Sequence, residues 1–262
     1  MEIRNKAAIV TGSSVGIGRA TAVLLASKGC HVVVNCRRTA KEAEETAEMC
    51  RAAGAEALVV QADISRDAEC RRLVASGVER FGRLDILVNN AGMTRFVRFE
   101  DLEGLTQEMW EEIFATNVYG SFYCARAAVP HLRKAGGGGI VNVASIAGTQ
   151  ATGSSIAYAA AKAAVINMTR SLARTLGPEI RVNAVAPGAV DTRWTRDGSG
   201  VAAYEAVREA YRQTMPLRDI VSADAVAEAI VWLIEGASMT TGEILTVDAG
   251  AHLGPGAPIN RR

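Results

Sequence analysis

Short apolar runs alternate with longer segments of helical period along most of the chain. The runs are rich in β-branched residues and predict the strands Ala7–Val10, His31–Asn35, Ala57–Gln61, Leu84–Asn89, Ile140–Ala144, Arg181–Ala186 and Ile244–Val247. The intervening segments predict the helices Gly16–Lys28, Ala40–Ala53, Asp67–Phe81, Thr106–Arg133, Ser155–Leu176 and Ala223–Glu235. Strands that are apolar throughout and separated by helices indicate an α/β fold, with helices on both faces of a parallel sheet. Right-handed crossovers make such a sheet doubly wound.

The chain has no internal repeat and no linker long enough to separate two domains, so residues 1–250 are expected to form one domain. Gly136–Gly139 predicts a tight loop after a helix. The stretch Thr192–Met215 has no strand pattern and looks like an insertion with a short amphipathic helix, which we expect to act as a lid. The tail, residues 251–262, is rich in Gly and Pro and is expected to be irregular.

The composition of the chain indicates which kinds of partner and which cellular compartment to expect. Lys and Arg total 29 and Asp and Glu total 28, so the chain favours neither a nucleic acid nor an anionic membrane as partner. No run approaches the ~18 apolar residues that span a bilayer. The five cysteines have no CxxC spacing and the three histidines lie far apart, which predicts neither a disulfide framework nor a metal site. The expected compartment is the cytoplasm.

The first predicted strand ends in a glycine-rich turn that leads directly into a helix, Thr11-Gly12-Ser13-Ser14-Val15-Gly16-Ile17-Gly18. Glycines let the backbone approach a pyrophosphate, and a helix N-terminus offers N–H groups to an anion. The spacing is GxxxGxG, which departs from the common GxGxxG dinucleotide fingerprint. On its own, the turn is as readily a packing feature as a phosphate site.

Polar residues also follow other predicted strands, at the carboxyl edge where such sheets bind ligands. They follow the third, fourth and fifth strands, as Asp63, Asn89-Asn90-Ala91-Gly92 and Ser145. Taken singly, Asn and Gly are typical of turns, and Asp and Ser are typical of helix caps. None of these positions defines a site by itself.

Tyr158 and Lys162 are four residues apart in a predicted helix and therefore share one of its faces. A cation beside a phenol favours the phenolate and lowers the tyrosine pKa toward the working pH, as acid/base catalysis requires. Such pairs are also common on helix surfaces. The pair gains meaning only from its context.

That context is the order of the features along the chain. The glycine turn, the Asn-Asn-Ala-Gly segment, Ser145, the Tyr158/Lys162 pair and Pro187-Gly188 each occur at a strand's carboxyl end or in the following helix. Together they resemble the short-chain dehydrogenase/reductase family over residues 4–250. The resemblance implies a single-domain, Rossmann-like fold and hydride transfer between a nicotinamide dinucleotide and a carbonyl or secondary alcohol.

The resemblance also implies roles for individual residues. The family's catalytic tetrad corresponds to Asn117, Ser145, Tyr158 and Lys162. Ser145 would bind the substrate oxygen, and Tyr158 would donate or accept the proton. Lys162 would lower the Tyr158 pKa and bind the nicotinamide ribose, and Asn117 would hold a water of a proton relay. The other implied cofactor contacts are Gly12, Ser14, Gly16, Ile17, Gly18, Asp63, Ile64, Asn90, Ala91, Gly92, Pro187, Gly188, Val190 and Thr192.

The end of the second strand bears on the choice of cofactor. Folds that prefer NAD usually place an acidic residue there, which binds both ribose hydroxyls. This chain has Cys36 at that position, followed by Arg37 and Arg38. Guanidinium groups suit a 2′-phosphate, although either arginine could instead be a solvent-exposed strand-end charge. We therefore expect NADP(H) to be preferred, with NAD(H) as the alternative.

Within the family, Ser171–Arg174 and Thr241–Glu243 look like 3-oxoacyl-(acyl-carrier-protein) reductases, which usually carry Arg where this chain has Val15. NAD-dependent sugar, polyol and steroid-type alcohol dehydrogenases share these features and are the alternative reading. A non-catalytic nucleotide-binding protein on the same fold is a third hypothesis. It is disfavoured because both Tyr158 and Lys162 are present.

The expected partners are a small or medium-sized carbonyl or alcohol substrate and further copies of the chain. The loop Ile146–Ile156 consists of small and polar residues, which leave room in a cleft. The helices predicted at Thr106–Arg133 and Ser155–Leu176 carry Ala and apolar residues on more than one face. By the resemblance they would form an intersubunit bundle, in a homotetramer or at least a homodimer.

Overall fold

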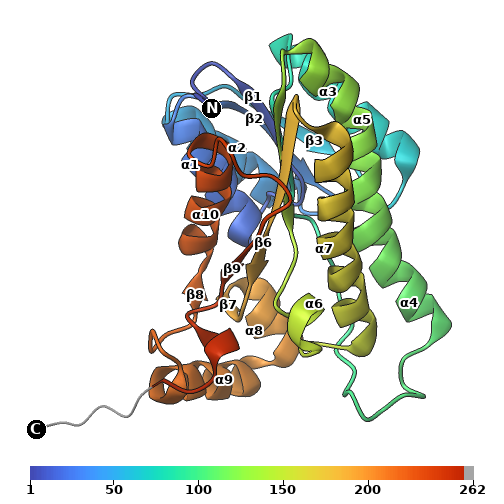
Figure 1. The fold of residues 1–262 in the computed structure, drawn as a ribbon, viewed down its shortest axis with the longest axis vertical. Coiled ribbons are helices and arrows are strands. Elements are labelled where there is room, and N and C mark those ends of the chain that lie inside the picture. The colour runs from blue at the N-terminus through green and yellow to red at the C-terminus, as the bar shows by residue number, and fades with distance from the viewer. Residues whose placement is uncertain (257–262) are drawn as a thin grey trace, which may run out of the picture.

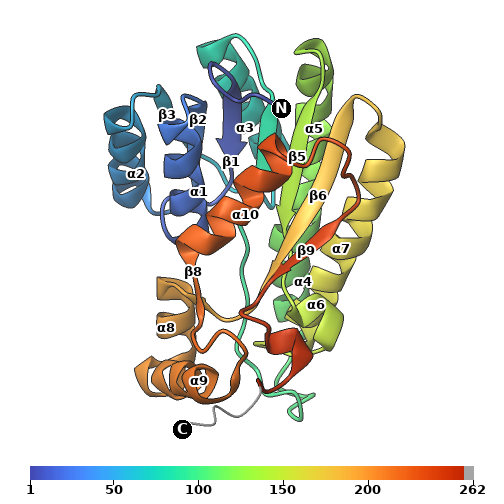
Figure 2. The same ribbon diagram turned by 60° about the vertical axis from the view of Figure 1, so that its left-hand side comes forward.

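Seven parallel strands form the central sheet of the protein (Figures 1 and 2). The computed structural model describes residues 1–256 and gives the strand order β3-β2-β1-β4-β5-β6-β9. The strands are β1 Ala7–Val10, β2 His31–Cys36, β3 Ala57–Gln61, β4 Ile86–Asn89, β5 Gly138–Val143, β6 Ile180–Pro187 and β9 Ile244–Val247. The prediction of a doubly wound, seven-stranded parallel sheet is confirmed, with every strand end within two residues of its expected place.

Helices cover both faces of the sheet (Figure 2). One face carries α1 (Gly16–Ser27), α2 (Ala40–Ala52) and α10 (Ala223–Glu235), and the other carries α3 (Asp67–Phe81), α5 (Gly120–Lys134) and α7 (Ile156–Leu176). Each face buries its own apolar cluster, with Leu25 and Ile230 in the first and Leu73 and Leu132 in the second. Each fully buried aliphatic side chain contributes roughly 1.5–3 kcal/mol to folding.

The path of the chain creates a crevice at one point of the sheet. From β1 the chain passes through β2 to β3 at one edge and then returns to β4, which pairs with β1 on its other side. The connections at the carboxyl ends of β1 and β4 therefore lead away from each other. In open α/β sheets ligands bind at such a switch point.

The helix predicted over Thr106–Arg133 is not continuous, and this part of the prediction is wrong. The structure has α4 (Gln107–Phe114), a π-helical turn η1 (Ala115–Tyr119) and then α5. Within the turn, the amide of Asn117 donates to the carbonyl oxygens of Ile113 and Met93, each at 2.8 Å. A side chain that bonds the backbone one turn back competes with the regular helical ladder, which accounts for the widened turn here.

The insertion at Thr192–Met215 also differs from its prediction. It contains two helices, α8 (Arg193–Ser199) and α9 (Val201–Thr214), rather than one short helix. Gly200 lies between them with φ of 81°, a conformation that favours glycine. The short strands β7 (Val190–Asp191) and β8 (Val221–Ser222) pair beside the insertion and were too brief to be seen in the apolar pattern.

Smaller differences occur in two glycine-rich regions. Gly136 and Gly137 form the expected turn with positive φ, but β5 already begins at Gly138, so the predicted loop over Gly136–Gly139 is too long. The tail contains a 3-10 turn, η2 (Ala251–Leu253), and its residues 257–262 lie outside the described part of the chain. Across residues 1–256, no helix combines the length and apolarity that crossing a membrane requires.

Candidate active site

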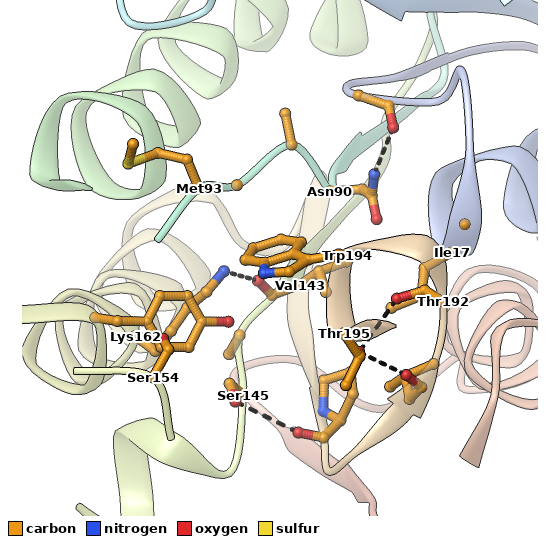
Figure 3. A pocket seen from close by; sticks show the side chains of 18 of the residues that line it. Ile17, Asn90, Met93, Val143, Ser145, Ser154, Lys162, Thr192, Trp194 and Thr195 are labelled. Atoms are coloured by element: carbon orange, nitrogen blue, oxygen red, sulfur yellow. Dashed lines mark hydrogen bonds between the residues drawn. The ribbon is translucent and has the colours of Figure 1, made fainter. Parts of the chain in front are cut away.

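A cavity of about 660 Å³ opens at the carboxyl edge of the sheet (Figure 3). The ends of β1, β4, β5 and β6 contribute to its lining, together with α7 and the segment around α8. The structure brings most of the predicted site residues to it: Gly12, Gly16, Ile17, Arg37, Asp63, Ile64, Asn90, Ala91, Gly92, Ser145, Tyr158, Lys162, Pro187, Gly188, Val190 and Thr192. Of the remaining predicted residues, Ser14, Gly18, Arg38 and Asn117 do not line this cavity.

The glycine turn packs so closely that side chains are excluded at two positions. Gly12 has φ of 61°, and a Cβ added to it would lie 2.8 Å from Ala91 Cα. A Cβ on Gly18 would lie 2.5 Å from Asn90 Nδ2 and 2.6 Å from the Gly12 carbonyl oxygen. Helix α1 begins at Gly16 with Val15 as its N-cap, which provides no side-chain cap. This N-terminus at the cavity wall therefore suits the pyrophosphate of a dinucleotide.

Two asparagines hold the glycine turn in place. Asn90 Nδ2 donates to the carbonyl oxygens of Thr11 and Gly12 at 2.8 and 3.0 Å. Asn35 Oδ1 accepts the Gly12 N–H at 3.1 Å, while its Nδ2 donates to the carbonyl oxygens of Val60, in β3, and Ala62, directly after β3. Asn90 was a predicted cofactor residue, whereas Asn35 was missed. The available signal for Asn35 was a polar residue inside an otherwise apolar strand.

Tyr158, Lys162 and Ser145 meet at the other side of the cavity. Ser155 caps α7 and its Oγ accepts the Tyr158 N–H at 3.3 Å, so Tyr158 lies in the first turn of the helix. One turn later, Lys162 Nζ donates to the Val143 carbonyl at 2.8 Å and lies 5.6 Å from the centre of the Tyr158 ring (Figure 3). Ser145 Oγ accepts the Ala147 N–H at 3.1 Å, which orients it at the end of β5.

Burial sets the protonation of this pair. It raises the pKa of Tyr158 to about 12, and a hydrogen bond with Ser145 opposes the rise only in part. It also lowers the pKa of Lys162 to about 8. Desolvation dominates at the phenol in this structure, and the ammonium group bonds to the Val143 carbonyl. The lowering of the Tyr158 pKa by Lys162 stays a prediction.

Asn117 stands just behind the cavity and presents an unsatisfied acceptor. It is 1% exposed, and its Oδ1 has no hydrogen-bond partner among the described residues. A Cβ placed on Gly92 would lie 2.9 Å from this oxygen and 3.6 Å from Lys162 Nζ, so both groups approach Gly92. A buried acceptor without a donor is unfavourable unless water satisfies it. This arrangement suits the relay water implied for Asn117.

The insertion contributes residues to the cavity lining, and some other lining residues were missed. Arg193, Trp194, Thr195 and Tyr211 line it from the insertion. The missed lining residues include Asn35, Met93, Val143 and Ala189, whereas Ile146 begins the loop that was expected to leave room in a cleft. Val143 lies two residues before Ser145, so its place at the strand end was a usable signal. Met93 carried no comparable signal.

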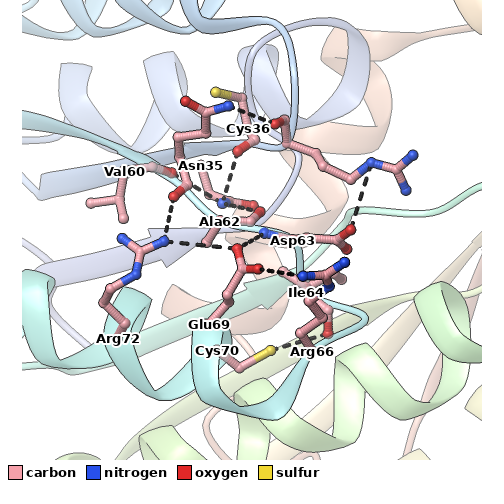
Figure 4. A network of polar contacts seen from close by, with 12 residues as sticks. Asn35, Cys36, Val60, Ala62, Asp63, Ile64, Arg66, Glu69, Cys70 and Arg72 are labelled. Atoms are coloured by element: carbon pink, nitrogen blue, oxygen red, sulfur yellow. Dashed lines mark hydrogen bonds and ion pairs between the residues drawn. The ribbon is translucent and has the colours of Figure 1, made fainter.

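A second hollow of about 430 Å³ is rich in arginine. It is lined by Arg37, Arg38, Gln61, Asp63, Arg66, Glu69 and Arg72, of which Arg37 and Asp63 also line the main cavity. The carboxylate of Glu69 lies 3.8 Å from both Arg66 and Arg72 and accepts the Asp63 N–H at 2.7 Å (Figure 4). The four guanidinium groups outnumber the two carboxylates, so the hollow suits an anion.

Arg37 is held toward the main cavity by Asp63. Its Nε lies 3.8 Å from Asp63 Oδ2. Burial alone would raise the pKa of Asp63, but hydrogen bonds from Ser65 and the charge of Arg37 keep it below its usual value. Asp63 is therefore ionised at neutral pH and orients Arg37 at the border between the two hollows.

Comparisons with known proteins agree with this arrangement. A family model described as enoyl-(acyl carrier protein) reductase matches residues 12–252. A Streptomyces violaceoruber protein named as ketoacyl reductase 2 of the granaticin polyketide synthase is 49% identical, over 94% of this chain and 96% of its own. The 3-oxoacyl-(acyl-carrier-protein) reductase of Staphylococcus epidermidis is 32% identical, over 95% and 100%. The structure of a short-chain dehydrogenase from Burkholderia cenocepacia in complex with NADP has a TM-score of 0.86 and 35% identity, over 96% and 100%.

The buried ammonium group predicts a stability change on its removal. Because the pKa of Lys162 is lowered from 10.5 to about 8 on folding, the free energy of unfolding should rise as pH increases from 8 to 10.5. In that window the unfolded chain still binds a proton that the folded protein has released. Lys162→Met should remove this rise and raise the free energy of unfolding at pH 7 by about 1–3 kcal/mol, measured by urea denaturation.

The matched control is Lys134→Met, on the exposed end of α5, which should keep both the stability and its pH dependence. A Lys162→Met protein that is less stable than wild type at pH 7 would show that desolvation of this ammonium is not the dominant effect.

Proposed function

The chain belongs to the short-chain dehydrogenase/reductase family, and on this premise we propose that it reduces the keto group of a 3-oxoacyl substrate with NADPH. Membership makes it an oxidoreductase that interconverts a carbonyl and an alcohol. The observation that carries the proposal is the convergence of Ser145, Tyr158 and Lys162 on a cavity whose opposite wall is the glycine turn.

The residues present fit a dinucleotide. The uncapped start of α1 would bind its pyrophosphate, and the closely packed Gly12 would let the backbone approach it. Lys162 uses one N–H on the Val143 carbonyl, which leaves donors for the ribose hydroxyls. When bound, NADPH supplies the hydride, and the remaining work falls to the side chains of the chain.

Two hydroxyl groups would act on the substrate carbonyl. Ser145 would donate to the carbonyl oxygen and stabilise the negative charge that develops there, because the Ala147 N–H already orients its Oγ. Tyr158 would give its proton to the same oxygen. A pKa of about 12 keeps this phenol protonated at neutral pH, which supports the reductive direction.

Lys162 and Asn117 would return the proton to Tyr158. Lys162, with a pKa of about 8, exchanges protons readily near neutral pH. Asn117 Oδ1 and Lys162 Nζ both approach Gly92, so one water could bridge them and connect the ammonium to the relay. These two residues act through Tyr158 and not directly on the substrate.

The proposed substrate class rests on the relatives and on the lining. Two relatives are named as reductases of ketoacyl or 3-oxoacyl groups. Met93 and Ile146 give the cavity an apolar lining that suits an acyl chain. Val15 lines the cavity where 3-oxoacyl-(acyl-carrier-protein) reductases usually have Arg, so the proposal covers the 3-oxoacyl group and not recognition of the carrier protein. The relatives' names favour this class over a sugar, polyol or steroid dehydrogenase.

The preference for NADP(H) over NAD(H) is part of the proposal. Cys36 ends β2 without a carboxylate, and Arg37 borders both the cavity and the arginine-rich hollow. A 2′-phosphate at this border would meet Arg37 first, with Arg38 and Arg66 nearby. The NADP complex of the Burkholderia cenocepacia relative supports the same choice.

We also propose that the enzyme is a cytoplasmic homotetramer or homodimer. Tyr119 and Phe122, beside and on α5, are 49% and 39% exposed, and such aromatic surfaces mark interfaces between subunits. All five cysteines are free and buried, which suits a reducing compartment. The proposed interface leaves the cavity residues Ser145 and Lys162 within one chain.

Tyr158→Phe tests the proton donor. The variant should bind NADPH normally but lose ~10²-fold or more in turnover, the contribution that a general acid supplies. The assay follows the absorbance of NADPH in the presence of an acetoacetyl thioester. Tyr119→Phe makes the same chemical change at an exposed tyrosine and should keep its turnover. Near-wild-type turnover by Tyr158→Phe would remove Tyr158 from the mechanism.

Arg37→Asp tests the cofactor preference. A single charge-assisted hydrogen bond of about 1.5–3 kcal/mol implies a roughly tenfold to hundredfold preference of the wild type for NADPH in kcat/KM. The variant should reverse that preference, because aspartate repels the 2′-phosphate and accepts hydrogen bonds from ribose hydroxyls. Arg133→Asp, at the exposed end of α5, carries the same charge change and should leave the ratio unaltered. A wild-type preference for NADH would refute the role of Arg37.

A further inference from the structure

Trp194 lines the cavity and belongs to none of the apolar core clusters of the described chain. It belongs to α8 and is 41% exposed, yet Figure 3 shows its ring crossing the middle of the cavity between Asn90 and Lys162. Its ring stands edge-on to the Tyr158 ring, with centroids 6.1 Å apart and an interplanar angle of 73°. The indole therefore occupies the space directly in front of the proposed proton donor.

The tip of the indole reaches the floor of the cavity. Trp194 Cη2 lies 3.4 Å from the position that a Cβ on Gly92 would take, and Lys162 Nζ lies 3.6 Å from the same position. Under the proposed function, the nicotinamide ribose must come to Lys162 and the nicotinamide ring must lie near Tyr158. The indole and the nicotinamide half of the dinucleotide would thus compete for one volume, because two groups cannot pack into it together.

We propose that Trp194 is a gating residue: in the free protein its indole fills the nicotinamide end of the cavity, and the dinucleotide binds there only when the indole moves out. The proposal rests on the proposed function for the identity of the ligand. The adenosine half meets no such obstacle, since the glycine turn and Arg37 lie at the other end of the cavity from Tyr158.

The contacts around α8 hold its backbone and leave the indole free to rotate. Thr195 Oγ1 donates to the Val190 carbonyl at 2.7 Å and fixes the start of the helix. Arg196 pairs with Asp191 and lies 5.4 Å from the centre of the Tyr204 ring on α9. Trp194 is 41% exposed, so its indole can leave the cavity by a change of side-chain rotamer while α8 stays in place.

Calorimetric titration with two probes separates gating from ordinary binding. NADPH would occupy the whole cavity, whereas adenosine 2′,5′-bisphosphate corresponds only to the adenosine half of the dinucleotide, whose place the indole leaves open. Trp194→Ala should bind NADPH more tightly than wild type, with Kd lower by roughly tenfold. In wild type only the small fraction of molecules whose indole has left the cavity can bind NADPH, whereas every molecule of the variant can. The Kd for adenosine 2′,5′-bisphosphate should not change.

Trp232→Ala is the matched control, since Trp232 is 52% exposed on α10 and does not line the cavity. Trp194→Phe, which keeps a smaller ring in place, should give an intermediate Kd for NADPH. The fluorescence of Trp194 is obtained by subtracting the tryptophan emission of Trp194→Phe from that of wild type. This difference should change when NADPH binds. An NADPH Kd that is equal or weaker in Trp194→Ala, or an equal gain for both probes, would overturn the proposal.

The titrations test the gate, and the reduction assay tests the proposed substrate class separately. If Trp194→Ala binds NADPH more tightly but neither protein reduces an acetoacetyl thioester, the gate stands and the proposed substrate class falls. If wild type reduces the thioester and Trp194→Ala binds NADPH as wild type does, the reaction stands and the gate falls. If neither probe binds to any of the proteins, the cavity is not a dinucleotide site and both proposals are wrong.

Discussion

The buried ammonium group of Lys162 is the constraint on which the site depends. The side chain is 3% exposed, and its bond to the Val143 carbonyl ties α7 to the end of β5. That tie sets Tyr158, one turn earlier on α7, opposite Ser145, which follows β5. The desolvation that lowers the pKa of Lys162 to about 8 weakens the fold at neutral pH. Proteins tolerate such local destabilisation where it serves a reaction, and perturbed pKa values therefore cluster at functional sites.

Close backbone packing is the second requirement, and it connects the acid/base pair to the proposed cofactor. There is no room for a Cβ at Gly12 or Gly18. The side chain of Asn90 packs against the turn and donates hydrogen bonds to its carbonyl oxygens. The segment that starts with Asn90 continues to Gly92, which both Lys162 Nζ and Asn117 Oδ1 approach. One short stretch after β4 thus touches both the phosphate-binding turn and the proton relay. The switch point between β1 and β4 is what allows this proximity.

Much of the fold could be predicted because its strands are apolar throughout and its helices have a clear period, so strand ends were located within two residues. The glycine turn, Tyr158 and Lys162 were found because local spacing alone reports them. The break at Asn117 was missed because the bonds of its side chain to the Ile113 and Met93 carbonyls form only in the folded chain. Likewise, Arg72 reaches the arginine-rich hollow by a bond to the Gln61 carbonyl at the end of β3, and the raised pKa of Tyr158 follows from burial. Spacing carries no information on such tertiary contacts.

The most direct test of the account is the ionisation of Tyr158 in the free protein and in the protein saturated with NADP⁺. It can be followed by NMR of ¹³C-labelled tyrosine, with the Tyr158→Phe spectrum to assign the signal. The account predicts a pKa of about 12 in the free protein, since burial disfavours the phenolate. The positive charge of the oxidised nicotinamide should lower that pKa by about one unit or more, because a nearby cation favours the phenolate. A Tyr158 that titrates near the ordinary tyrosine value in the free protein, or that does not respond to NADP⁺, would contradict the account.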